Sequence, residues 1–272
     1  MGLERQAEIV ISSDYSPFHG PRQIEEHFKF SNSTLGVNNL KYEIFAWRWV
    51  DPEGDRLHGR ISGWMPASGE TKLDMMRLWF IEMFLMPTDK MLKFAHEHNI
   101  KQVLVHTNEA IVWAKRLGNF SYNNIVWVEG GLTESIERIY ETLNEVAIYG
   151  NPFNCGVVID LGHLFYNEER SVKNYEILLA KALNELTRLR AKYPQYRISF
   201  HVPLNHNGYD RDAVVELDFS NDTLKELLKM ADGPITIESQ GSPKVWFDRN
   251  AMINNGKCLA EAYWRIRSCI SK

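Results

Sequence analysis

The sequence predicts a single α/β domain over residues 1–272, in which eight strands and their helices close into a (β/α)8 TIM barrel. Short apolar runs recur eight times, and several are nearly continuous in Val and Ile, as in strands buried on both faces. Amphipathic helical patterns separate most of these runs, which is typical of parallel β–α–β units. No linker, repeat or low-complexity segment divides the chain, and single barrels often have about 250 residues.

The expected strands are short and evenly distributed along the chain, at 8–12, 42–47, 57–64, 102–106, 125–129, 156–160, 198–202 and 235–239. The expected helices occupy 73–99, 108–119, 133–150, 171–193, 220–232 and 258–271. No helical pattern separates the second strand from the third, so we expect an irregular connection early in the barrel. An open doubly wound sheet is the alternative, but the chain has no GxGxxG or GxxxxGK[ST] phosphate turn.

The composition is that of an ordinary globular protein, with 44% hydrophobic residues, 24% charged residues and a formal net charge of −4. This mildly acidic balance argues against a nucleic-acid partner, which normally requires a basic face. No leader pattern and no run of 18 apolar residues occurs, so we expect a cytoplasmic protein without a membrane partner. The three cysteines lack CxxC spacing, and Cys155 is expected to be a small core residue.

Ionisable side chains and imidazoles stand at or just beyond the ends of the later strands. They are His106, Glu129, Asp160, His163, His201 and Glu238. Because the carboxyl ends of all strands meet on one face of a barrel, we expect these side chains to converge there. Crowded carboxylates repel one another and are costly to bury unless a cation binds them. Mixed Glu, Asp and His ligands favour Mn²⁺, Zn²⁺, Co²⁺ or Mg²⁺ over a metal that prefers thiolates.

The order of these residues resembles that of the xylose-isomerase-like TIM barrels, a superfamily of sugar isomerases, sugar epimerases and endonuclease IV. The most specific piece is DLGHLF at 160–165, which is similar to the family's D-x-x-H-x-F. The ordered series VxE, DxxH, FH and IE extends the resemblance over nearly the whole chain. The resemblance implies one divalent metal held by Glu129, Asp160, His201 and Glu238. It also implies that the two glutamates act as acid and base and that His163 binds substrate oxygens.

A divalent-metal-dependent sugar or sugar-phosphate isomerase or epimerase is therefore the function expected first. Such an enzyme moves a proton next to a carbonyl group through a metal-stabilised enediolate, with Glu129 and Glu238 as acid and base. The expected substrate is a small polyhydroxy compound, and His106, Arg211 and Trp64 are further candidates to bind it. Members of the resembling family often pair, so a homo-oligomer is compatible with this expectation.

Two alternatives stay open at this point. The first is an endonuclease IV-like phosphodiesterase that acts on abasic DNA, in which His106 and His163 would be metal ligands as well. Its larger metal cluster is incomplete here, because the third expected strand ends in ISGWMP without a His and no Asp-x-His follows His201. The second alternative is a non-catalytic barrel that binds a small ligand, since a fold does not imply a function.

Overall fold

The computed structural model describes residues 9–13, 41–44, 59–60, 102–107, 110–111, 114, 125–130, 134–149, 155–166, 172–203, 218–238 and 249–271. Its strands are β1 (Ile9–Ser13), β2 (Lys41–Ile44), β3 (Gly59–Arg60), β4 (Gln102–His106), β5 (Ile125–Glu129), β6 (Cys155–Asp160), β7 (Arg197–Pro203) and β8 (Ile235–Glu238). Its helices are α5 (Ile136–Ala147), α6 (Leu161–Tyr166), α7 (Val172–Lys192), α8 (Asp222–Lys229) and α10 (Arg249–Ile270). The helix expected at 73–99 lies outside the described residues, and only 110, 111 and 114 of the helix expected at 108–119 are described.

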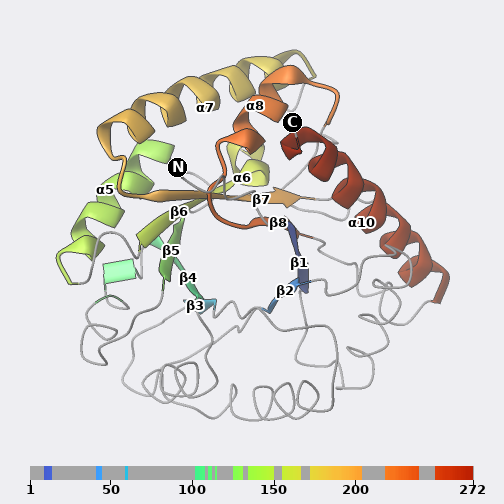
Figure 1. Ribbon diagram of the computed structural model, residues 1–272, viewed down its shortest axis with the longest axis horizontal. Coiled ribbons are helices and arrows are strands. Elements are labelled where there is room, and N and C mark those ends of the chain that lie inside the picture. Colours follow the sequence, from blue (N-terminus) through green and yellow to red (C-terminus); the bar gives the residue numbers. More distant parts are fainter. Residues whose placement is uncertain are drawn as a thin grey trace, which may run out of the picture.

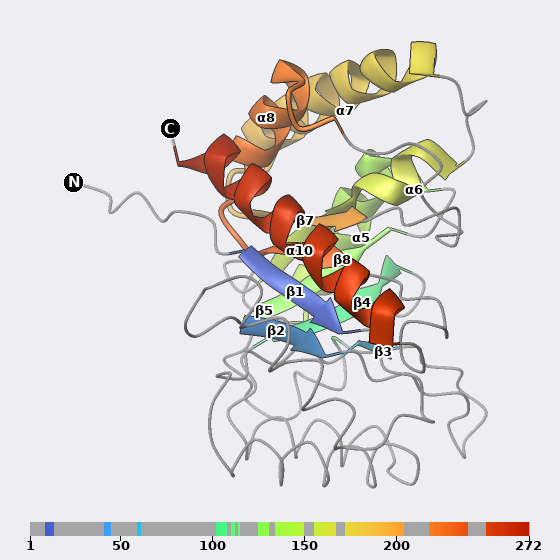
Figure 2. The ribbon, with the colours of Figure 1, turned by 90° about the vertical axis from the view of Figure 1, so that its right-hand side faces the viewer.

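The strands form one eight-stranded sheet in the order β2-β1-β8-β7-β6-β5-β4-β3. Among the described residues, every pairing of neighbouring strands is parallel except that of β3 with β4. Figure 1 shows the sheet curved into an arc, with α5, α7, α8 and α10 on its outer side. Figure 2 shows α10 running along the outside of β1. This arrangement confirms the predicted α/β class with a largely parallel sheet.

The third strand differs from the expected pattern in both length and direction. It is limited to Gly59–Arg60 and pairs antiparallel with β4, through Gly59 with Val105 and Arg60 with Leu104. A parallel crossover needs a connection of about a dozen or more residues and usually a helix. The 14 residues between Ile44 and Gly59 contain no helical pattern, unlike the usual crossover between parallel strands. The irregular early connection expected from the sequence therefore includes a reversed strand.

Alternation along the strands separates two sets of side chains. One set packs with the helices in the main core and includes Val126, Val128, Val157, Ile159, Ile198, Phe200, Val202, Ile235 and Ile237. The residues between them lie on the opposite face, because successive side chains of a strand point to opposite sides of the sheet. Leu104, Trp127 and Val158 of that second set form a separate cluster. The helices cover the first face, so the second face is the interior of the barrel.

The helices cover the outer face through apolar stripes at helical spacing. In α5, Ile136, Ile139, Tyr140, Leu143 and Val146 are all buried. The helix begins later than Thr133, because Ser135 is its cap and its Oγ accepts a hydrogen bond from the Arg138 backbone N–H at 3.2 Å. Asn221 caps α8 in the same way.

The floor of the barrel is closed by the indole of Trp127, which is only 2% exposed. A Cβ atom added at Gly156 or at Gly233 would lie 2.2 Å from the Trp127 ring. Only glycine permits so close an approach of backbone and ring at these two positions. Trp127 precedes Glu129 by two residues on β5, so its side chain lies on the same face of the sheet, beneath the strand end.

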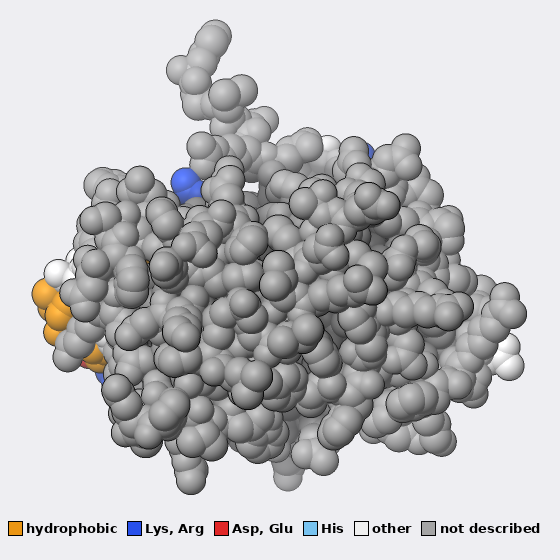
Figure 3. All heavy atoms as spheres, turned by 90° about the horizontal axis from the view of Figure 1, so that it is seen from below, with side chains coloured by type: hydrophobic (Ala, Val, Ile, Leu, Met, Phe, Trp, Pro, Cys, Tyr) orange, Lys and Arg blue, Asp and Glu red, His pale blue; other side chains and the backbone are white. Residues whose placement is uncertain are grey.

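Within the described residues, no helix combines the length and the apolar content that crossing a bilayer requires. The large hydrophobic side chains that are exposed among the described residues are Ile148, Tyr149, Ile177 and Trp264. In the view from below in Figure 3, described side chains reach the surface only at its margins.

A cluster of buried weak acids lies between α5 and the first residues of β6 and β7. Tyr140 packs on Tyr193 and Tyr196, with ring centroids 5.7 and 6.3 Å away, and the Tyr196 hydroxyl donates to Asn144 Oδ1 at 2.7 Å. Burial raises the pKa of the Cys155 thiol to about 11, and burial is also the main cause that raises the pKa of both Tyr140 and Tyr196. The expectation that Cys155 is a core residue is confirmed, since it is 3% exposed.

We expect the free energy of unfolding to fall as the pH rises from about 9 to about 11. A buried acid with a raised pKa stabilises the fold fully below its unfolded pKa, and this contribution disappears as the pH passes the folded pKa. For Cys155 the contribution is roughly 3 kcal/mol. Urea unfolding across this pH range should show that the free energy of unfolding of Cys155→Ala falls less steeply with pH than that of the native protein. Tyr149→Phe is the control, because it changes a tyrosine that is 40% exposed, and its free energy of unfolding should fall as that of the native protein does. An identical decline in Cys155→Ala would contradict the assignment.

Candidate metal centre

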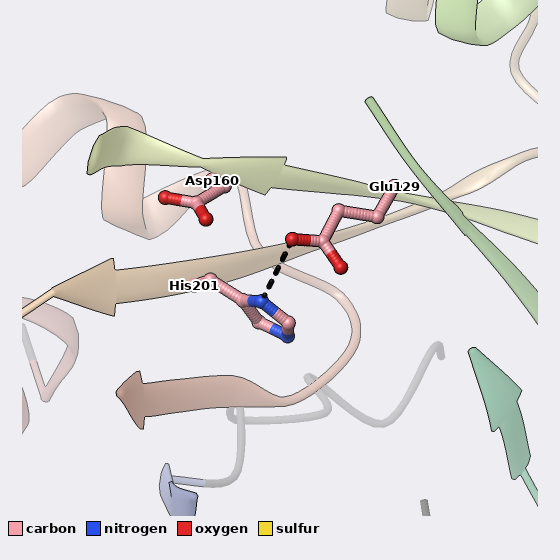
Figure 4. A group of neighbouring side chains, drawn as sticks. All are labelled: Glu129, Asp160 and His201. Carbon is pink, nitrogen blue, oxygen red and sulfur yellow. Dashed lines mark ion pairs between the residues drawn. The ribbon is translucent and has the colours of Figure 1, made fainter. Parts of the chain in front are cut away.

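Three of the expected metal ligands converge in the barrel interior. Glu129, Asp160 and His201 come from the consecutive strands β5, β6 and β7, and their exposed fractions are 0%, 6% and 1%. One potential ligand atom of each lies within 4.8 Å of those of the other two. Figure 4 shows the Glu129 carboxylate turned toward the imidazole, with His201 Nδ1 3.4 Å from Glu129 Oε1. These two carboxylates and one imidazole could bind a divalent metal ion.

The register of the sheet explains why these residues meet. Asp160 pairs with His201 across β6 and β7, and Glu129 pairs with Val158 across β5 and β6. Val158 and Asp160 are two residues apart, so they lie on the same face of β6. All three potential ligands are therefore on the interior face, at the carboxyl ends of their strands. This end is where TIM barrels build their active sites.

Asp160 has a second structural role at the start of α6. Its Oδ1 accepts hydrogen bonds from the backbone N–H groups of Gly162 at 2.7 Å and His163 at 3.2 Å. The carboxylate thereby satisfies backbone donors that a helix start leaves without internal partners. A Cβ atom at Gly162 would lie 3.1 Å from Asp160 Oδ1 and 3.2 Å from Pro203 Cγ, so glycine suits this tight turn. The short helix that follows holds the carboxylate in place.

Two histidines lie at the edge of this group of three. His106 pairs with Glu129 across β4 and β5, and its Nε2 is 3.8 Å from Glu129 Oε2. His163 Nε2 is 3.2 Å from Asp160 Oδ2, and its Nδ1 is 3.1 Å from the Gly130 carbonyl oxygen. Their side chains are 20% and 16% exposed, so neither is a solvated surface residue. Their expected contact with a substrate stays a prediction.

The remaining expected site residues are described in part or not at all. The backbone of Glu238 ends β8 opposite Pro203, two residues beyond the pair of His201 with Thr236. Its side chain lies outside the described part of the structure, as do Arg211 and Trp64. The fourth metal ligand and the acid–base role of Glu238 therefore stay predictions.

Sequence reasoning missed a contact that braces the rim of the site. Thr107, directly after His106, is 7% exposed, and its hydroxyl donates to Glu134 Oε2. The bond ties the end of β4 to the segment before α5. The only sequence signal was a hydroxyl residue next to the strand-end His, which is too common to identify a contact 27 positions away.

Comparison with known proteins rests on structural likeness. No protein-family model and no curated protein matches the chain. The spore coat polysaccharide biosynthesis protein SpsE of Bacillus subtilis matches with a TM-score of 0.56 and 14% identity, over 99% of this chain and 70% of that one. The N-acetylneuraminic acid (sialic acid) synthetase of Leptospira borgpetersenii serovar Hardjo-bovis matches with a TM-score of 0.51 and 12% identity, over 97% and 84%. These likenesses confirm the TIM-barrel fold across nearly the whole chain.

The comparisons also correct the family and the function expected from the sequence. The similar structures are a polysaccharide biosynthesis protein and a sialic acid synthetase, not xylose-isomerase-like proteins. The assignment to that superfamily is wrong, and so is the expected sugar isomerase or epimerase function with its abasic-DNA alternative. The physical reason is that barrels with different reactions can place Glu, Asp and His at the carboxyl ends of their strands. The series VxE, DxxH, FH and IE therefore indicates where a site lies, not which reaction occurs there.

Proposed function

We propose that the protein is a divalent-metal-dependent enzyme that acts at the carbonyl group of a small sugar, in an aldol-type condensation that builds a sugar acid. The observation that carries this proposal is the buried group of Glu129, Asp160 and His201 at the carboxyl ends of three neighbouring strands. The sialic acid synthetase among the structural neighbours supports a sugar acid as the class of product.

The residues of the site suit this chemistry. Glu129, Asp160 and His201 would hold the ion, which supplies Lewis acidity toward a carbonyl oxygen when it is bound. Leu104, Trp127 and Val158 close the interior below them with an apolar floor, which keeps water from approaching from that side. His106 lies 3.8 Å from Glu129 at the edge of the group, where an imidazole can exchange a proton with a substrate oxygen.

The charge balance of the site also suits a condensation that forms an anionic product. Two carboxylates and a divalent ion leave a nearly neutral centre, and imidazoles at its edge can donate hydrogen bonds to the anionic groups of a sugar acid. Water in the site would compete with the carbon nucleophile for the polarised carbonyl, so a buried position benefits condensation. The three potential ligands, each at most 6% exposed, meet this requirement.

The test combines metal analysis with a search for product. We expect about one divalent ion per chain by mass spectrometry after loading with Mn²⁺, Zn²⁺ or Co²⁺. Aldoses with and without phosphate are then incubated with pyruvate, whose methyl carbon would add to the aldehyde, or with phosphoenolpyruvate, from which the same addition consumes one water and releases inorganic phosphate. We expect formation of a 2-keto-3-deoxy sugar acid that stops when a chelator is added and resumes when metal is restored. Metal-loaded protein that forms no such product from any pair would overturn the proposed reaction, and failure to bind any ion would overturn the metal centre itself.

A further inference from the structure

We infer that His163 is a positioning residue of the metal centre, which fastens the end of β5 to Asp160 and so sets the distance between two metal ligands. The inference rests on the proposed metal centre and deepens it. Its basis is a set of contacts that His163 makes to residues of two neighbouring strands. These contacts differ from the substrate contact that the sequence resemblance implied for this residue.

The first contact joins His163 to the strand that carries Glu129. His163 Nδ1 lies 3.1 Å from the carbonyl oxygen of Gly130, the residue directly after Glu129. A carbonyl oxygen only accepts hydrogen bonds, so Nδ1 is the nitrogen that carries the hydrogen in this contact. This bond fixes the plane of the imidazole ring relative to the end of β5. The two residues are 33 positions apart, so the bond is a tertiary contact and not part of a local turn.

The second set of contacts joins His163 to both oxygens of Asp160. Its backbone N–H donates to Asp160 Oδ1 at 3.2 Å, and its Nε2 lies 3.2 Å from Asp160 Oδ2. The Gly162 N–H adds a third contact, to Oδ1 at 2.7 Å. The two backbone N–H groups hold the Asp160 carboxylate through Oδ1, and the imidazole ring that Gly130 orients lies against Oδ2, so the carboxylate has little freedom to rotate. Asp160 thus meets a metal ion in an orientation that His163 and the start of α6 have already selected.

Two other roles fit these distances less well. The potential ligand atoms that lie within 4.8 Å of one another, among the described residues, belong to Glu129, Asp160 and His201, and His163 is not in that group. His163 therefore lies beside the group of three rather than within it. Both ring nitrogens of His163 already face protein oxygens, at 3.1 and 3.2 Å. A substrate would have to displace one of these contacts in order to bind the ring.

Removing a side chain that is hydrogen-bonded to a metal ligand typically lowers metal affinity by about 10–100-fold. We therefore expect His163→Ala to weaken Co²⁺ binding by about 10–100-fold. The visible absorption spectrum of Co²⁺ at saturation should stay that of the native protein, because all ligands remain. His201→Ala, which removes a nitrogen ligand, should instead change or abolish this spectrum.

Two conservative variants separate the contacts of the ring. The amide nitrogen of His163→Asn reaches the position of Nδ1 and should restore the bond to Gly130. The longer side chain of His163→Gln reaches the position of Nε2 and should restore the contact to Asp160. We expect both variants to bind Co²⁺ with affinities between those of His163→Ala and the native protein. Arg188→Ala, which removes an exposed 3.2 Å ion pair with Glu137, is the control and should bind as the native protein does.

Isothermal titration of the full chain with Co²⁺, together with absorption spectra, decides between these outcomes. Native affinity in His163→Ala would overturn the positioning role. A saturated His163→Ala spectrum that has lost a nitrogen ligand would overturn it in favour of direct ligation. A native protein that binds no Co²⁺ would overturn both the inference and the metal centre, whereas intact binding without product would overturn only the proposed reaction. If His163→Ala does not fold, the Co²⁺ affinities and spectra of His163→Asn and His163→Gln are judged by the same criteria.

Discussion

Replacing Glu129 with Gln is expected to remove measurable binding of a divalent metal and the thermal stabilisation that the metal produces. Glu129 is 0% exposed, with Oε1 3.4 Å from His201 Nδ1 and Oε2 3.8 Å from His106 Nε2. Gln keeps the shape of the side chain but removes the negative charge that offsets the cost of dehydrating the ion. The loss of metal affinity should be larger than the loss of about 10–100-fold that is typical when a group hydrogen-bonded to a metal ligand is removed. In the native protein, metal at about 100 times its Kd should add roughly 2.7 kcal/mol of stability.

Thermal unfolding with and without Mn²⁺ or Zn²⁺ measures this effect directly. Glu134→Gln is a matched control, because it neutralises another carboxylate near the end of β5, which accepts a hydrogen bond from Thr107 outside the group of three. The control should keep the full metal-dependent rise in Tm, while Glu129→Gln should show none. A similar rise in both variants would show that Glu129 does not hold the ion.

Replacing Gly156 with Ala is expected to destabilise the fold by about 1–3 kcal/mol or more. Ala would normally gain about 0.5–1 kcal/mol over Gly in a strand, because it restricts the unfolded chain. Here the added Cβ atom would lie 2.2 and 2.3 Å from two carbons of the Trp127 ring. The ring is 2% exposed and has no room to move away, so the steric overlap outweighs the gain.

A double-mutant cycle with Trp127→Leu isolates the overlap from the other effects of each change. Trp127→Leu is itself expected to be destabilising, because it leaves a cavity in the barrel floor. The double variant should lose clearly less stability than the sum of the two single variants, since the smaller side chain makes room for the new methyl group. Denaturant unfolding gives the three free energies. Additive losses would mean that Trp127 does not occupy the space above Gly156.

The strands were predicted closely where their apolar runs were continuous. β4 and β5 have the expected bounds, and β6, β7 and β8 differ from theirs by a residue at one or both ends. Helix starts were harder to predict, because several neighbouring residues can act as the N-cap, as Thr133 and Ser135 could for α5. α10 begins at Arg249, well before Cys258, through a segment whose Asn and Gly residues weaken the helical pattern. α6 was missed altogether, since a helix of 6 residues with Gly162 in its first turn is too short for periodicity to reveal.

The site was predictable in position but not in its reaction. Period-two alternation and the ends of parallel strands were enough to expect Glu129, Asp160 and His201 in one place. The hydrogen bonds that orient them were not, because the contact of His163 with Gly130 depends on how the ends of β5 and β6 approach in space. The reaction was assigned wrongly, since the same donor atoms at strand ends serve different chemistries and the identity of a substrate depends on loops and side chains around them.

The alternation described for β4 to β8 also limits how this sequence can change. Along β6, Val157 and Ile159 contact the helix layer, while Val158 and Asp160 serve the interior. A substitution alters one of these environments and leaves the other intact. A one-residue insertion or deletion within the strand would exchange both at once, because side chains that now face the helices would turn inward and the Asp160 carboxylate would turn toward the helices. Length variation among related proteins is therefore expected in the loops between these elements, and strand lengths should be preserved even where hardly any residue is shared.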